Sequence, residues 1–177
     1  MIGTTRAHHA NVINAMAGGG MSAYDTFKAE APIGMGILIK RFHLADFQAA
    51  GVMGNFGRES GGFINLRESK TPGVGGYGFG QWTGPRHVLF LNWCAKHGLE
   101  WHTPEANWGY LAHELSGEDR RNNYAYVVAH LRESKSLEEA TRAFMNYYER
   151  PGVPAFPDRL HWAQMALAAY HAHVAEA

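Results

Sequence analysis

The sequence predicts a predominantly α-helical α+β domain that carries one small antiparallel β-sheet. Apolar residues recur at helical spacing over most of the 177 residues. One glycine- and aromatic-rich stretch, residues 61–82, breaks this pattern and is typical of a β-hairpin or a three-stranded sheet. Hydrophobic residues make up 46% of the chain, which is enough for a sizeable core in a domain of this length.

Composition excludes several classes of partner. The formal net charge is zero, so no general attraction to nucleic acid or to an anionic membrane is expected. Cys94 is the only cysteine, which rules out an intramolecular disulfide and indicates a reducing site of synthesis. No apolar run approaches the roughly 20 residues of a membrane span, and the N-terminus does not resemble a secretory signal. We therefore expect synthesis in a cytoplasm, without membrane insertion.

The first part of the chain predicts four helices. An amphipathic helix over 5–17 is followed by the flexible joint Gly18–Gly20, and short helices are expected over 22–30 and 33–42. A longer helix is expected over 44–60. We interpret residues 1–32 as an N-terminal helical segment and residues 33–177 as one compact domain.

The helix over 44–60 carries an unusual set of glycines. Helix stability falls by about 1 kcal/mol for each glycine that replaces alanine. The presence of Gly51, Gly54 and Gly57 therefore calls for a structural or functional explanation. Close packing of another helix is favoured for the first two, and room for a ligand is the alternative. Gly61 and Gly62 end the helix, which places Glu59 in the last turn. Because the free carbonyls there disfavour a negative charge, the position predicts a protonated carboxyl group, as a general acid requires.

Helices also dominate the rest of the chain. Thr83 and Pro85 begin a strongly apolar helix through His97, which we expect to be the buried central helix. Further helices are expected over 103–115, 122–132, from the capping box at Ser136, and over 158–173. Prolines at 151, 154 and 157 predict a loop before the last of these.

Three sequence blocks resemble the phage tail lysozyme family of peptidoglycan hydrolases. They are GNFGRESGGF, GGYGFGQWTGPR and FMNYYERPG, and the resemblance covers about residues 34–170. It implies a lysozyme-like fold and cleavage of the β-1,4 bond between N-acetylmuramic acid and N-acetylglucosamine. It also places Glu59 at the catalytic acid position, where it protonates the glycosidic oxygen. The alternative is a surface glutamate paired with Arg58 or Arg67.

The second catalytic group is less defined. Glu68 follows Glu59 by nine residues and is the preferred candidate, although similar phage lysozymes carry aspartate there. Lys70 could instead pair with Glu68 and make both structural. Glu149 is a rival, but its neighbour Arg150 suggests an ion pair that orders the loop. In lytic transglycosylases the N-acetyl group of the substrate assists, so no second carboxylate is needed.

Aromatic and amide side chains predict the sugar-binding wall. Strand alternation places Tyr77 and Gln81 on one face and Trp82 on the other, so we assign the first two to substrate and Trp82 to the core. Tyr147 and Tyr148 lie on neighbouring helix faces, so one should pack and the other reach the cleft. We take Tyr147 as a candidate substrate-binding residue.

Other motifs point to no cofactor or metal. Residues 73–78 match G-x-G-x-x-G, but no buried strand precedes them and no helix follows directly. Cys94 lies among apolar residues, as an inert buried thiol does. The histidine pairs His8–His9 and His171–His173 lack an H-E-x-x-H motif or a cysteine cluster.

The resemblance leaves two alternatives to a muramidase. One is a lytic transglycosylase acting on the same bond, and the other is a non-catalytic glycan-binding or virion structural module. The expected substrate is bacterial peptidoglycan, and phage tail or virion proteins are possible partners. Without a signal, the protein would reach the wall through a pore made by another protein or as part of a virion.

Overall fold

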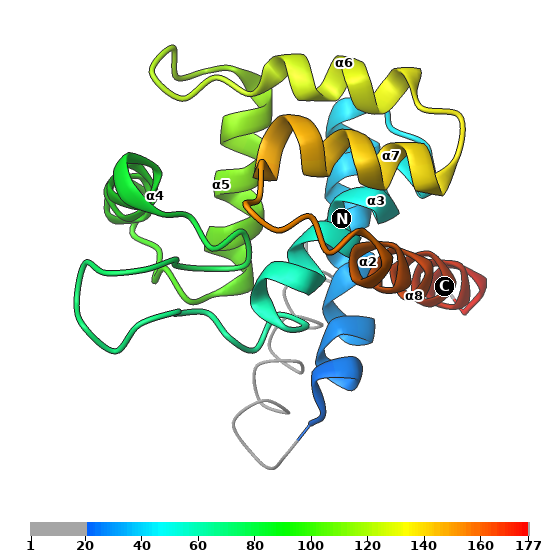
Figure 1. The fold of residues 1–177 in the computed structure, drawn as a ribbon, viewed down its shortest axis with the longest axis horizontal. Helices are drawn as coiled ribbons and strands as arrows, with labels where there is room; N and C mark the ends of the chain where they lie inside the picture. The colour runs from blue at the N-terminus through cyan, green and yellow to red at the C-terminus, as the bar shows by residue number, and fades with distance from the viewer. Residues whose placement is uncertain (1–20, 177) are drawn as a thin grey trace.

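The computed structural model describes residues 21–176, which fold into seven α-helices and one π-helical turn (Figure 1). The helix predicted over 5–17 lies outside the described residues. The elements are α2 (Ala23–Phe42), α3 (Asp46–Ser60), α4 (Gly84–His97), α5 (Pro104–Ser116), α6 (Ala125–Glu133), α7 (Leu137–Phe144), the π-helix η1 (Met145–Glu149) and α8 (Phe156–Ala175).

The central helix is α3, and the prediction that α4 occupies this position is wrong. Helices α2, α7 and α8 all pack against α3, most of whose residues are buried. In contrast, α4 buries only His87, Phe90 and Cys94 and lies at the edge of the bundle (Figure 1). Val88 on α4 is 55% exposed. Apolar residues on α4 therefore cover one side of the core, while the small residues of α3 allow three helices to surround it.

The glycines of α3 make this close packing possible. A Cβ atom at Gly51 would lie 2.7 Å from the backbone nitrogen of Thr141 on α7, and one at Gly54 would overlap the backbone of α8. At Gly57 a Cβ atom would lie 2.7 Å from the ring of Phe27 on α2. The packing interpretation is thus confirmed for Gly51 and Gly54, and it extends to Gly57.

One continuous helix, α2, replaces the two short helices predicted before residue 43. Ser22 caps it, since its hydroxyl accepts a hydrogen bond from the amide of Asp25. Pro32 lies inside the helix and is buried; it removes one backbone hydrogen bond without ending the helix. The boundary predicted between residues 32 and 33 falls within α2.

The predicted antiparallel sheet does not form, which corrects the α+β fold class. Among residues 21–176 the only β pairing consists of two isolated bridges, Arg67 with Tyr77 and Tyr77 with Trp82. The backbone turns at positive φ at Gly73, Gly75 and Gly78 and again at Gln81, where φ is 45°. These turns interrupt the extended conformation that a ladder requires, so residues 61–83 form a loop on a helical bundle.

The helix cap and the proline-containing loop in the last third of the chain agree with the prediction, except at Pro157. Ser136 caps α7 by accepting from the amide of Glu139. Pro157 was expected to exclude helix, but it occupies the first turn of α8, where a missing amide hydrogen costs nothing. The loop is therefore confined to residues 150–155.

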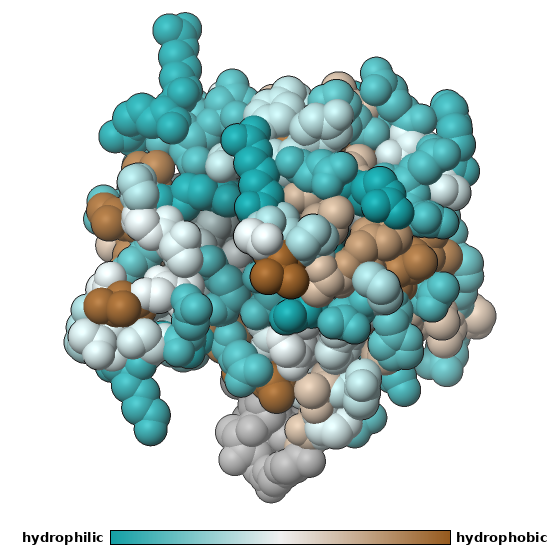
Figure 2. All heavy atoms as spheres, viewed as in Figure 1, coloured by the Kyte–Doolittle hydropathy of each residue, from teal (hydrophilic) through white to brown (hydrophobic). Residues whose placement is uncertain are grey.

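The surface is mainly hydrophilic in the view of Figure 2, with apolar side chains in small groups. None of the described helices combines the length and the apolar character that a bilayer span requires.

Candidate active site

A cleft of about 410 Å³ lies where the C-terminal end of α3 meets the 61–83 loop, the start of α4 and the end of η1. Its volume falls within the range usual for ligand sites. Three carboxyl side chains line it, those of Glu59, Glu68 and Glu149. The other lining residues are Arg58, Gly80, Gln81, Trp82, Thr83, Arg86 and Pro151.

Glu59 is placed in the cleft by the end of α3. Gly61 adopts the left-handed conformation with φ of 59°, and the amides of Gly61 and Gly62 both donate to the carbonyl of Gly57. The predicted glycine stop is thus confirmed. The hydroxyl of Ser60 donates to the carbonyl of Phe56, and this hydroxyl accepts from the chain that leaves the helix. The last turn, and Glu59 with it, is therefore firmly held.

A buried arginine contacts Glu59, and sequence reasoning missed it. Nη2 of Arg159 on α8 donates to Oε1 of Glu59 at 2.6 Å. Nε of Arg159 donates to the carbonyl of Pro154 at 2.7 Å and Nη1 to Oδ1 of Asn55 at 3.1 Å. Asn55 and Glu59 are four residues apart and therefore lie on one face of α3. This spacing is the sequence feature that indicates that a single residue could contact both. The expected partners do not pair with Glu59: Arg58 lies 3.5 Å from Asp158, and a guanidinium nitrogen of Arg67 donates to the carbonyl of Lys70.

Glu149 has an unusual environment at the end of η1. Its Oε1 atom is buried and has no hydrogen-bond partner among the described residues. Burial, and after it the negative charge of Glu59, raise the pKa of Glu149 to about 8. The predicted ion pair with Arg150 is absent from the described ion pairs, since Arg150 donates to the hydroxyl of Tyr126 at 2.6 Å. Glu149 is therefore a carboxyl group that stays protonated at neutral pH.

Glu68 lines the same cleft but is tied to the loop. Its Oε2 atom accepts from the amide of Gly76 at 2.9 Å, and its own amide donates to the carbonyl of Gly76. The alternative pairing with Lys70 is not among the described ion pairs. Glu68 thus stabilises the 67–77 turn, and its exposed side chain faces the cleft from there.

Two of the predicted substrate-binding residues differ in position: Gln81 lines the cleft and Tyr77 does not. Gln81 lines the cleft, and its Nε2 donates to the carbonyls of Asn65 and Gly78, both at 2.7 Å. Tyr77 is buried against His87, with ring centroids 4.0 Å apart, and does not line the cleft.

The two adjacent tyrosines of η1 behave differently. Tyr148 packs in the core, and Tyr147 is 38% exposed but stacks on His130 outside the residues that line the cleft. Trp82 is buried as predicted, and it forms the back of the cleft.

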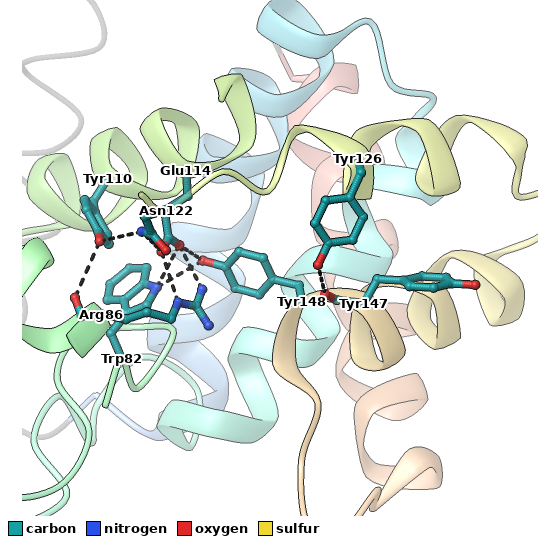
Figure 3. Close-up of polar contacts among 8 residues, drawn as sticks. All are labelled: Trp82, Arg86, Tyr110, Glu114, Asn122, Tyr126, Tyr147 and Tyr148. Atoms are coloured by element: carbon teal, nitrogen blue, oxygen red, sulfur yellow. Dashed lines mark hydrogen bonds and ion pairs between the residues drawn. The ribbon is translucent and has the colours of Figure 1, made fainter. Parts of the chain in front are cut away.

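A buried polar network supports this back wall (Figure 3). Glu114 is fully buried and accepts two hydrogen bonds from Arg86, at 3.1 and 2.9 Å. Trp82 Nε1 donates to Glu114 at 3.0 Å, and the hydroxyl of Tyr148 also donates to this carboxylate. Nδ2 of Asn122 also donates to the Glu114 carboxylate, at 2.5 Å. Because each buried polar group has partners, Trp82 and Arg86 are held rigidly beside the cleft.

A separate hollow of about 500 Å³ lies between α4, α5 and the 118–122 loop and shares no lining residue with the cleft. Its charges are largely paired with one another, Arg41 with Glu118 and Arg121 with Asp119. Within the described residues, no group of three or more His, Cys, Asp and Glu side chains could hold a metal ion. The cleft with three carboxyl groups is thus the candidate active site.

A helical domain with a glutamate at a helix end, facing a cleft lined by further carboxyl groups, is suited to general acid catalysis on a sugar. The profile of the phage tail lysozyme family matches residues 30–170. The chain therefore belongs to the phage tail lysozyme family, and its function is that of a peptidoglycan-degrading, lysozyme-like protein. No curated protein matches the chain.

Proposed function

We propose that the protein is a muramidase that cleaves the β-1,4 bond between N-acetylmuramic acid and N-acetylglucosamine in bacterial peptidoglycan, with Glu59 as the general acid. The observation that carries the proposal is the position of Glu59. It projects from the last turn of the central helix into the cleft of about 410 Å³. Membership of the phage tail lysozyme family supports the substrate class.

Protonation of the glycosidic oxygen by Glu59 lets the leaving sugar depart as an alcohol while an oxocarbenium-like cation develops on the other sugar. Carboxylates in the same cleft stabilise that cation electrostatically. Gln81 offers an amide to the glycan, and Trp82 with Arg86 forms a rigid wall behind it. These groups come from α3, the 61–83 loop and α4, so the cleft exists only in the folded protein.

Delivery belongs to the proposal as well. The enzyme is made in the cytoplasm of a host and reaches the wall either as a virion component, in contact with other tail proteins, or through a pore. The family description supports the first route.

Digestion of purified sacculi by the wild-type protein tests the reaction. Mass spectrometry of the soluble fragments should show reducing N-acetylmuramic acid ends. Fragments that end in 1,6-anhydro sugars would identify a lytic transglycosylase instead. Binding to sacculi without release of any fragment would overturn the enzymatic proposal and favour a glycan-binding module.

A further inference from the structure

The cleft contains a titratable group that the proposed reaction does not yet use, Glu149. It comes from η1, far from Glu59 in sequence, yet both side chains line the same cleft. One of its oxygens is buried with no hydrogen-bond partner among residues 21–176. A carboxylate buried without partners is costly, so this environment selects the neutral acid.

The two carboxyl groups have opposite surroundings. Glu59 is contacted by the guanidinium of Arg159, which stabilises an anion. Within the described part of the chain Glu149 has no such contact, and burial together with the charge of Glu59 raises its pKa to about 8. The two acids therefore differ in how readily they lose a proton: Glu149 holds one at neutral pH and can supply it to Glu59, which faces the glycosidic oxygen.

We propose that Glu149 is the catalytic partner of Glu59, in place of Glu68, and that it holds the proton that Glu59 delivers to the glycosidic oxygen. The inference rests on the proposed glycosidase function. In the reaction the O–H bond of the pair breaks as its proton moves to the glycosidic oxygen, and the C–O bond electrons stay with the leaving sugar. Water then adds to the sugar cation, and the proton that it releases restores the pair.

Charges on four surrounding helices act on Glu149. Arg86 on α4 and Arg159 on α8 favour ionisation of Glu149, whereas Glu59 on α3 and Glu114 on α5 oppose it. Burial is the largest of these effects, and it keeps the proton on the pair at neutral pH. The titration therefore belongs to the pair and not to either residue alone.

The pH–rate profile of Glu149→Gln tests the proposal. The amide matches the size of the neutral acid but has no proton to supply, so in this variant Glu59 must take its proton from solvent. We expect lysis of permeabilised cells at pH 7 to fall by at least about 10-fold and to recover as the pH is lowered to 5. Glu100→Gln, in an exposed loop, is the matched control and should keep the wild-type profile. An unchanged profile in Glu149→Gln would overturn the proposal.

A second measurement does not depend on the folding of that variant. Carbon-13 NMR of the glutamate carboxyl groups in the wild-type protein should show one group that titrates near pH 8. In Glu59→Gln the midpoint of this group should fall, because the neighbouring negative charge is gone. A midpoint that does not respond to Glu59→Gln would contradict the pairing. Glycan cleavage by the wild type would still support the proposed function in that case, so the two failures are distinguishable.

Discussion

Arg159 on the last helix donates from Nη2 to Oε1 of Glu59 at 2.6 Å, although the two residues are 100 positions apart. The Arg159 side chain is 2% exposed, and each of its three nitrogens has an acceptor. Gly54 allows α8 to approach α3 closely enough for this contact. The candidate acid is therefore positioned by the packing of two helices as well as by its own helix end.

Replacing Arg159 by methionine should destabilise the fold strongly. The variant leaves the carboxylate of Glu59, 25% exposed, without its cation and also orphans a buried amide oxygen. Loss of one partner of a buried pair costs about 3–5 kcal/mol, and partial hydration of Glu59 favours the lower end. Arg58→Met is the control, because its pair with Asp158 is solvent-exposed and worth less than about 1 kcal/mol. Urea unfolding compares the two, and equal losses would contradict this account.

Gly54→Ala should destabilise the protein while Gly36→Ala stabilises it. A Cβ atom at Gly54 overlaps the backbone of α8, and such overpacking costs typically about 1–3 kcal/mol. Gly36 lies inside α2 with no atom within 4 Å of the added carbon, so alanine gains about 0.5–1 kcal/mol there. Thermal unfolding of both variants checks the sign. A stable Gly54→Ala would show that α3 and α8 are not packed this closely.

The buried network around Glu114 predicts that Glu114→Gln lowers the free energy of unfolding much more than Glu118→Gln does. Glu114→Gln removes the buried charge that pairs with Arg86, whose side chain is 22% exposed, and should cost about 3 kcal/mol, the lower end of the range for a buried pair. Glu118→Gln removes an exposed partner of Arg41 and should cost less than about 1 kcal/mol. Denaturant titration measures both free energies of unfolding. Similar small losses would mean that the network does not stabilise the cleft wall.

Stability should depend on pH through Glu149. Its pKa rises from an ordinary value of 4.5 to about 8 on folding, so between these pH values the folded state holds a proton that the unfolded state has lost. The contribution of Glu149 to stability is therefore fully present below pH 4.5 and is lost as the pH rises to 8, at a rate of up to about 1.4 kcal/mol per pH unit.

The difference between wild type and Glu149→Gln isolates this effect. Glu30, whose pKa burial raises to about 7, is present in both proteins and cancels. The stability of the variant relative to wild type should increase from pH 5 to pH 8. A constant difference over this range would mean that Glu149 is ionised in the folded protein.

Local signals in the sequence were sufficient for most of the helices and for the position of Glu59 in the last turn of α3. The glycine stop after Ser60, the cap at Ser136 and the close-packing glycines all act within one element or through simple steric contact. Long-range features were not accessible in the same way. Nothing local to Arg159 indicates that it reaches Glu59, and the raised pKa of Glu149 depends on its burial and on charges from four other helices.

The sheet was predicted wrongly for a related reason. Alternating aromatic residues over 77–82 resemble a strand, but positive φ at Gly78 and Gln81 turns the chain after each short bridge. Tyr77 is consequently buried against His87, while Gln81 still reaches the cleft. Side-chain alternation cannot be extended across residues whose backbone leaves the extended conformation.

The most direct test of the central claim is the rate at which Glu59→Gln releases reducing ends from purified sacculi, compared with wild type at pH 7. A general acid contributes about 10²–10⁴-fold in rate, so the variant should lose at least about 100-fold while it still binds sacculi and unfolds cooperatively. Release at the wild-type rate by a folded Glu59→Gln protein would contradict the role of Glu59 as the acid.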